Sequence, residues 1–161
     1  MDKKQEIERK FLVNTLPNLM NAKRTVIRQG YLTQSGDSVE VRLRQKGGFF
    51  FLTVKSGEGL VRNERETEIT QSQFDSLWPV TQGQRVEKER WIGVIERDLY
   101  FELDIFEGIL APLVLVEVEF HSEEAANSFE VPTWFGREVT MDHRFKNKYL
   151  AMNTPTVEAS T

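Results

Sequence analysis

Alternation of side-chain polarity with a period of two residues is the feature that most restricts the fold of this chain. Successive side chains of a β-strand point to opposite faces, so this alternation is typical of strands with two unlike faces. Gly47-Gly48 and the sequence Ser56–Gly59 mark turns between neighbouring segments. We therefore expect a mainly β (α+β) domain of eight antiparallel strands. The strands are expected at about residues 6–13, 25–33, 38–46, 49–56, 62–70, 85–92, 99–106 and 113–121.

Three short stretches have helical spacing of their apolar residues instead, namely 71–79, 122–129 and 142–152. Pro79 is expected to end the first helix, and Ser122 is a candidate N-cap for the second. Since no linker interrupts the pattern, residues 1–153 are expected to form a single domain. The polar, aperiodic tail at 154–161 is expected to be disordered.

The composition excludes several classes of function. The chain of 161 residues has no cysteine, which excludes disulfides, zinc–thiolate sites and a cysteine nucleophile. A net charge of −4 gives no overall basic surface for nucleic acid, and no apolar run reaches membrane-spanning length. The charged N-terminus does not resemble a signal peptide. We expect a cytoplasmic protein without nucleic-acid or membrane partners, and the oligomeric state stays open, with a homodimer among the alternatives.

The polar face of most strands carries rows of full charges. In the first segment Glu6, Glu8 and Lys10 share one face, and the other face carries Ile7, Arg9, Phe11 and Val13. In the third segment Arg42 and Arg44 alternate with the apolar residues Val41 and Leu43. Such a face is most simply explained as the wet side of a sheet. However, acidic residues are disfavoured in strands, and here acids and bases are sorted onto different strands. A solvated surface gives no reason for that sorting.

Eight antiparallel strands can close into a barrel, which removes their exposed edges. If the charged face pointed inward, the apolar face would be covered by the few short helices. Charges enclosed in this way must be paired, hydrated or bound to ions. A hydrated tunnel for a polyanion fits this requirement, with Mg²⁺ or Mn²⁺ at the carboxylates and phosphates at the Lys and Arg side chains.

The order of the charged motifs resembles that of a known family. The chain has EIERKF at its start, followed by RQGYL, VRLRQ, VKS, FELDIF, LVEVEF, WFGREVT and RFKNKYLA. These motifs are similar to those of the CYTH superfamily, the triphosphate tunnel metalloenzymes, and the likeness extends over about residues 5–152. The small bacterial members, similar to inorganic tripolyphosphatases, match best. The resemblance implies a closed eight-stranded antiparallel tunnel and Mg²⁺- or Mn²⁺-dependent chemistry on triphosphates.

The resemblance also assigns roles to individual residues by position. The residues assigned to metal binding are Glu6, Glu8, Asp104, Glu117 and Glu119. Those assigned to the substrate are Lys10, Arg42, Arg44, Lys55, Lys88 and Arg90, with Tyr31 at a tunnel mouth and Lys146 near the C-terminus. Glu64 and Glu66 would support a second metal or position a water, so with Lys10 and Lys88 they form the expected catalytic set.

The expected reaction is the hydrolysis of a triphosphate, most simply inorganic tripolyphosphate. No Ser–His–Asp or Cys–His set is evident in the sequence, so direct in-line attack of an activated water on a terminal phosphoryl group is favoured. Alternatives with the same fold are a thiamine or nucleoside triphosphatase and a class IV adenylate cyclase. A non-catalytic polyphosphate-binding module is a further alternative, although it would need the cations without the recurrent acidic pairs.

Overall fold

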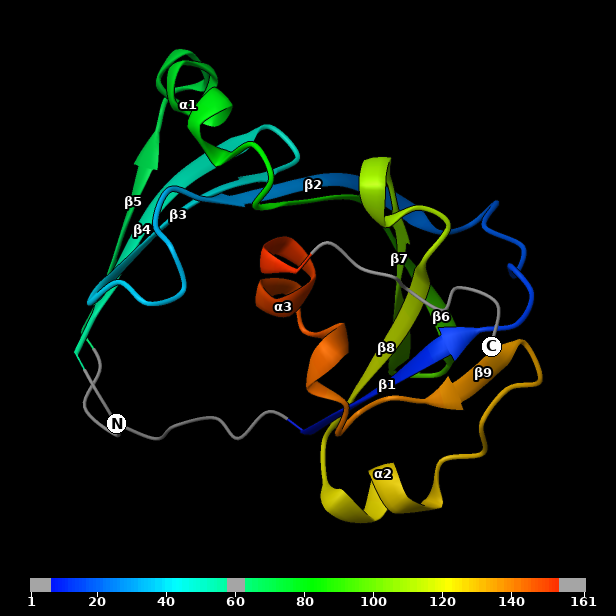
Figure 1. Cartoon of the computed structure of the whole chain (residues 1–161). Coiled ribbons are helices and arrows are strands. Elements are labelled where there is room, and N and C mark those ends of the chain that lie inside the picture. The colour runs from blue at the N-terminus through cyan, green and yellow to red at the C-terminus, as the bar shows by residue number, and fades with distance from the viewer. Residues whose placement is uncertain (1–6, 58–62, 154–161) are drawn as a thin grey trace.

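The described part of the chain is dominated by one antiparallel sheet (Figure 1). The computed structural model describes residues 7–57 and 63–153. Within these residues the sheet has nine strands in the order β5-β4-β3-β2-β6-β7-β8-β1-β9. The strands are β1 Ile7–Val13, β2 Lys23–Tyr31, β3 Val39–Lys46, β4 Phe49–Ser56, β5 Asn63–Ile69, β6 Arg85–Glu96, β7 Leu99–Phe106, β8 Val114–Phe120 and β9 Phe135–Glu138.

The prediction of a closed eight-stranded barrel is wrong, because the described residues form a sheet with a ninth strand and with no pairing between its edge strands β5 and β9. The short strand β9 pairs with β1, placing Phe135 opposite Val13. The pairing side of β1 is occupied further along as well, since the Val139 amide donates to the Lys10 carbonyl at 2.8 Å. This edge of β1 is therefore not free to pair with β5. In Figure 1 the sheet curls around α3 and leaves a gap between its two edge strands.

The predicted helices are present, with shorter bounds than expected. They are α1 Gln71–Leu77, α2 Glu123–Ser128 and α3 Asn147–Met152, with 3₁₀ turns η1 Trp78–Thr81, η2 Gly108–Leu110 and η3 His143–Phe145. Ser122 caps α2 by accepting a hydrogen bond from the Ala125 amide, as predicted. The α-helix α1 ends at Leu77, before Pro79, as predicted. The chain then continues as the 3₁₀ helix η1, whose first turn accommodates the proline.

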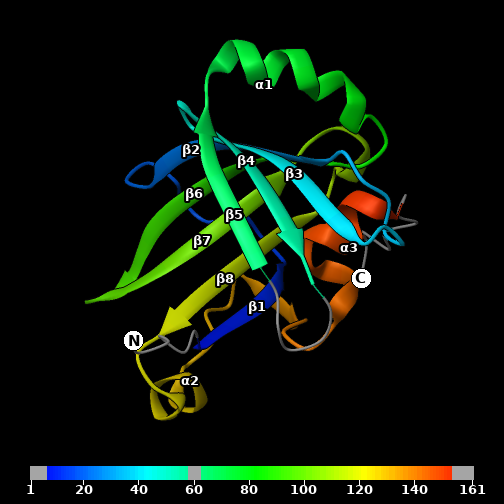
Figure 2. The same cartoon turned by 90° about the vertical axis from the view of Figure 1, so that its left-hand side faces the viewer.

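The apolar side chains of the strands cover the convex face, as predicted. On β3 and β4, Leu43 and Phe50 pack with Phe74 and Trp78 of the α1 region. A second apolar cluster lies where α2 contacts β1 and β8 (Figure 2). Its buried members are Phe11, Phe101, Leu103, Val116, Val118, Phe120, Ala126 and Phe135. Helices α1 and α2 thus cover the convex face, whereas α3, which was expected to help cover it, does not lie there.

Helix α3 lies inside the curl of the sheet and fills one end of the concave face (Figures 1 and 2). Its Leu150 and Ala151 pack with Phe145 against apolar side chains of the sheet and of the loops beside it. The sheet and loop residues in this cluster are Tyr31, Val86, Phe106, Leu110, Leu113, Leu115 and Val139. The charged part of the concave face therefore begins where this apolar cluster ends. No helix in the described ranges is both long and apolar enough to cross a bilayer.

Candidate active site

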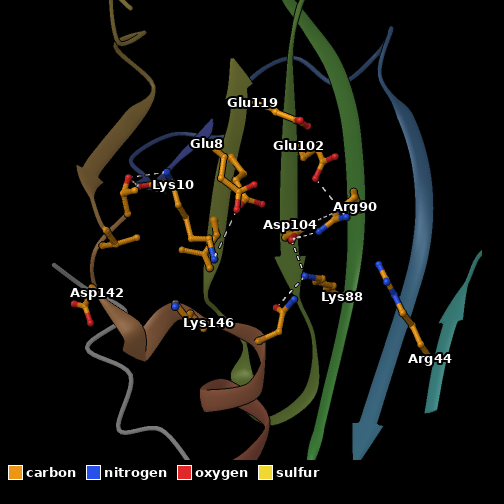
Figure 3. Close-up of a pocket in the computed structure, with 15 residues that line it drawn as sticks. Glu8, Lys10, Arg44, Lys88, Arg90, Glu102, Asp104, Glu119, Asp142 and Lys146 are labelled. Atoms are coloured by element: carbon orange, nitrogen blue, oxygen red, sulfur yellow. Dashed lines mark hydrogen bonds and ion pairs between the residues drawn. The ribbon is translucent and has the colours of Figure 1, made fainter. Parts of the chain in front are cut away.

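The charged residues of the concave face line a cavity of about 560 Å³ (Figure 3). Strands β1, β3, β6, β7 and β8 contribute to it, together with the segment 139–147. The lining residues are Glu8, Lys10, Arg44, Lys88, Arg90, Glu102, Asp104, Leu115, Glu117, Glu119, Val139, Thr140, Asp142, Lys146 and Asn147. The structure thus brings together nine of the residues that the sequence assigned to the site, and both signs of charge meet in one space.

The most buried ionic group of the cavity is formed by β6 and β7. The Asp104 carboxylate accepts from the Arg90 Nε at 2.9 Å and lies 2.8 Å from the Lys88 Nζ. Lys88 is 3% exposed and Asp104 is 7% exposed. Antiparallel pairing places Arg90 directly opposite Asp104, which explains this close geometry.

Burial and ion pairing act in opposite directions on these three groups. Burial alone would raise the pKa of Asp104, but the hydrogen bond from Arg90 and the charge of Lys88 hold that pKa below its usual range. For Lys88, burial outweighs the attraction of Asp104 and lowers its pKa. Both Asp104 oxygens already have cationic partners, because Arg90 contacts each of them and Lys88 contacts Oδ2. The assignment of Asp104 to metal binding stays a prediction.

Lys10 is held by the segment that follows β9. Its Nζ donates to the Phe145 carbonyl at 3.1 Å and lies 4.0 Å from a Glu117 oxygen. Its backbone amide donates to the Thr140 hydroxyl at 3.0 Å. The chain around η3 thus fixes both the backbone and the ammonium group of this cavity lysine.

An acidic group stands beside Lys10 on β1 and β8. The register places Glu8 opposite Glu119, and Glu117 opposite Lys10. Burial raises the pKa of Glu117 to about 7, with Lys10 opposing the shift and Glu8 reinforcing it. Two carboxylates crowded in this way offer hard oxygen ligands whose mutual repulsion a divalent cation would relieve.

This acidic group fits a divalent cation through its chemistry, although it is not a complete cage. Within residues 7–57 and 63–153, no cluster of three or more acidic or histidine side chains is arranged to hold a metal ion. Glu6, which the sequence assigned to the metal, lies outside the described residues. A cation at Glu8 and Glu117 would therefore need further oxygen ligands.

Two arginines on β3 carry donors that the fold does not use. In the described part of the chain, the Nε atoms of Arg42 and Arg44 are buried and have no hydrogen-bond partner. Burial lowers the pKa of Arg44, and the nearby charges of Arg42 and Arg90 lower it further. A buried donor without a partner is costly, and an anion in the cavity would remove that cost at Arg44.

Five of the assigned residues that the structure describes do not line this cavity, although all five lie on its face of the sheet. Glu64 and Glu66 are exposed on the edge strand β5, opposite Lys55 and Thr53 of β4. Thr53 donates its hydroxyl to Glu66 at 3.3 Å. Arg42 lies on β3 opposite Thr53. The roles assigned to Arg42, Lys55, Glu64 and Glu66 stay predictions.

Tyr31, the fifth of these residues, is only 2% exposed and belongs to the apolar cluster around α3. Its hydroxyl accepts a hydrogen bond from the Gln29 amide at 3.1 Å. Burial raises its pKa, and Arg42 opposes the shift. The predicted contact of Tyr31 with substrate is therefore not visible in the cavity and stays a prediction.

Some cavity residues were not assigned from the sequence. Glu102 lies 3.3 Å from the Arg90 guanidinium and lines the cavity, and its position on the charged face of β7 was the available signal. Asn147 accepts a hydrogen bond from the Lys88 Nζ at 3.2 Å. No strand pattern could reveal Asn147, because its position depends on α3 folding back into the curl.

Comparison with known proteins identifies the family of this chain. A family model for the CYTH domain matches residues 4–142, which is most of the chain. The chain belongs to the CYTH family. It is 55% identical to an inorganic triphosphatase of Nitrosomonas europaea, over 93% of this chain and 99% of that protein. An inorganic triphosphatase of Acetivibrio thermocellus is 36% identical, over 92% of this chain and 94% of that protein.

A solved structure resembles this CYTH chain in fold as well as in sequence. The crystal structure of the inorganic triphosphatase NE1496 superposes with a TM-score of 0.87 and is 52% identical. The match covers 95% of this chain and 98% of that one. This chain therefore shares its overall fold with that inorganic triphosphatase.

Proposed function

We propose that this CYTH protein is a metal-dependent inorganic triphosphatase that hydrolyses tripolyphosphate. The observation that carries the proposal is the meeting of cationic and acidic side chains around one cavity of about 560 Å³. The inorganic triphosphatases to which the chain is 55% and 36% identical support the same assignment. A triphosphate is small and carries several negative charges, which Lys and Arg side chains together with a divalent cation held by the carboxylates would neutralise.

The cations of the cavity are proposed to hold the phosphate chain. The Arg44 Nε is a buried donor that finds no partner among residues 7–57 and 63–153, so a phosphate oxygen would give it one. Lys10 and Lys146 line the same space and can add positive charge. Arg42 and Lys55 lie on the same face of β3 and β4, and we assign them to the outer part of the substrate.

The acidic side is proposed to hold Mg²⁺ or Mn²⁺, with Glu8, Glu117 and Glu119 as ligands and Glu6 as a further candidate. Such a cation neutralises phosphate oxygens and lowers the pKa of a bound water. Glu8 and Glu117 stand close enough to interact with each other, and Glu119 lies opposite Glu8 in the sheet. Carboxylates are the ligand type that both of these hard cations prefer.

The proposed reaction is direct attack of water on a terminal phosphorus atom, in line with the bridging oxygen that leaves. The new P–O bond forms as the bridging P–O bond breaks, which gives orthophosphate and pyrophosphate, and the water loses a proton to solvent or a carboxylate. Lys88 and Arg90 stabilise the negative charge that develops on the transferred group and on the leaving oxygen. Glu64 and Glu66 are proposed to orient the water from β5.

A substrate panel tests this proposal. Phosphate release is measured with tripolyphosphate, pyrophosphate, thiamine triphosphate and ATP, each with Mg²⁺, with Mn²⁺ and with EDTA. We expect metal-dependent release that is fastest with tripolyphosphate. Faster turnover of thiamine triphosphate or ATP, or formation of a cyclic nucleotide, would move the substrate assignment elsewhere in the family. Binding of tripolyphosphate without any turnover would overturn the proposal in favour of a binding module.

A further inference from the structure

The ammonium group of Lys88 has a second partner that comes from outside the sheet. Besides Asp104 at 2.8 Å, the Asn147 carboxamide oxygen accepts from the Lys88 Nζ at 3.2 Å. The Lys88 side chain is 2% exposed, and its Nζ lies 5.2 Å from the centre of the Phe106 ring. Asn147 is the first residue of α3, so the contact joins the helix inside the curl to the most buried cation of the cavity (Figure 3).

We propose that Asn147 is a positioning residue for Lys88, and this inference rests on the proposed triphosphatase function. A lysine ammonium has three N–H donors. Asp104 and Asn147 take two of them, which leaves one donor for a phosphate oxygen in the cavity that Lys88 lines. Two fixed partners also restrict a side chain that is otherwise flexible, so the remaining donor is held in one direction.

A neutral acceptor suits this position better than a charged one. Asp104 already lies between Lys88 and Arg90 and supplies one negative charge to the pair. Asn147 lines the cavity, as Asp142 does. A carboxylate in place of the Asn147 carboxamide would therefore add negative charge where the substrate carries its own. The carboxamide orients Lys88 without repelling the phosphate chain.

A purely structural role for Asn147 can be separated from this positioning role, because α3 has another attachment to the sheet. Lys148 forms an ion pair with Glu40 of β3 at 2.6 Å. Replacing Lys148 with methionine removes this attachment and does not touch Lys88. Lys148→Met is therefore the matched control for a loss of helix docking.

The kinetic test compares tripolyphosphate hydrolysis by the wild type and by Asn147→Leu, Asn147→Asp and Lys148→Met. We expect Asn147→Leu to lower kcat about tenfold with little change in KM, the size expected from one hydrogen bond to a charged group. Asn147→Asp keeps the acceptor, so its kcat should stay nearer to that of the wild type while KM rises. Lys148→Met should keep both constants. Equal losses of kcat in Asn147→Leu and Lys148→Met would overturn the proposal.

A second measurement does not depend on turnover. With ¹⁵N-labelled lysine, the Lys88 ammonium is observed by NMR without substrate, and its proton exchange is compared between the wild type and Asn147→Leu. Faster exchange in the variant supports the proposal, and unchanged exchange overturns it. If the wild type itself releases no phosphate, the proposed function fails, and the NMR comparison still decides whether Asn147 holds Lys88.

Discussion

Two regions of the concave face, an inner wall and an edge wall, satisfy their charges in different ways. The inner wall, formed by Lys88 and Arg90 of β6 with Asp104 of β7, is buried and internally paired. The edge wall, formed by the concave faces of β3, β4 and β5, is different. It carries Arg42 and Arg44, whose buried Nε atoms lack partners in the described part of the chain. Its acids on β5 are exposed to solvent.

This difference indicates that one wall contributes mainly to the free energy of folding and the other mainly to the free energy of substrate binding. A buried cation whose counter-ion is already in place is part of the folded framework, and removing its partner leaves an uncompensated charge. A buried donor without a partner costs stability in the free protein and recovers that cost when an anion binds. We therefore expect the inner wall to govern folding and the edge wall to govern substrate affinity.

The largest expected effect is the replacement Asp104→Asn on the inner wall. It leaves the buried Lys88 without its counter-ion and leaves Arg90 with only the more exposed Glu102 as an ion-pair partner, so we expect the free energy of unfolding to fall by about 3–5 kcal/mol. Urea denaturation without metal and phosphate measures this change. The matched control is Glu102→Gln, because Glu102 also contacts Arg90, at 3.3 Å, but its side chain is 42% exposed. That variant should lose less than about 1 kcal/mol, and equal losses in the two would contradict the distinction between buried and exposed partners.

The second prediction concerns the acidic group beside the two walls. Glu8→Gln keeps the size of an exposed side chain, so the free energy of unfolding should change by less than about 0.5 kcal/mol. If Glu8 is a metal ligand, metal-dependent phosphate release should fall by about a hundredfold, since one hard ligand is lost. A Mg²⁺ titration of the rate measures this, with Glu123→Gln on the exposed start of α2 as the control. A variant with the wild-type rate at every Mg²⁺ concentration would remove Glu8 from the metal site.

The third prediction tests the edge wall directly. Arg44→Met keeps a long side chain but removes the unpartnered donor and a cation that Arg42 and Arg90 repel. We expect no loss of stability in the free protein, together with a rise of about tenfold in KM for tripolyphosphate. Thermal unfolding with and without tripolyphosphate should show a smaller stabilisation by substrate than in the wild type. The control is Arg24→Met, because Arg24 pairs with Glu89 on the opposite face of the sheet. A strongly destabilised Arg44→Met would mean that both walls belong to the folded framework.

The sequence predicted that the sheet has one charged and one apolar face, because this division depends on the local alternation of side chains along each strand. Lys88 and Arg90 share one parity of β6, and the family resemblance assigned them to the site together with Asp104. Arg90 directly faces Asp104 in the register, and Lys88 lies two residues along the same face of β6. The openness of the sheet could not be predicted in the same way. It depends on competition for the free edge of β1, which the four residues Phe135–Glu138 occupy. A strand this short has too few residues to show a period of two.

The site residues that lie on strands were predictable from the sequence, whereas those that depend on the placement of α3 were not. Residues on strands, such as Glu8, Arg44 and Glu117, follow from parity and from the family resemblance, and they do line the cavity. The position of Asn147 in the cavity does not follow from parity, because its contact with Lys88 requires helix α3 to enter the curl of the sheet. The burial of Tyr31 has the same cause, since α3 brings Leu150 and Ala151 into the same apolar cluster.

The smallest expected effect is on the outermost strand of the edge wall. Glu66 is exposed and accepts a hydrogen bond from the buried Thr53 hydroxyl at 3.3 Å. Glu66→Gln can still accept this bond, so its free energy of unfolding should stay within about 0.5 kcal/mol of the wild type. If the charge of Glu66 orients the attacking water, kcat should fall about fivefold, which corresponds to about 1 kcal/mol for an exposed charge.

Glu68→Gln is the matched control for Glu66→Gln, because Glu68 lies two residues away on the same face of β5, opposite Phe51. The rate of phosphate release is measured for both variants at saturating tripolyphosphate. Equal rates in the two would show that β5 supplies only general negative charge to the open edge. A selective loss in Glu66→Gln would assign a part in the reaction to a residue that adds almost nothing to folding, which is the behaviour expected of the edge wall.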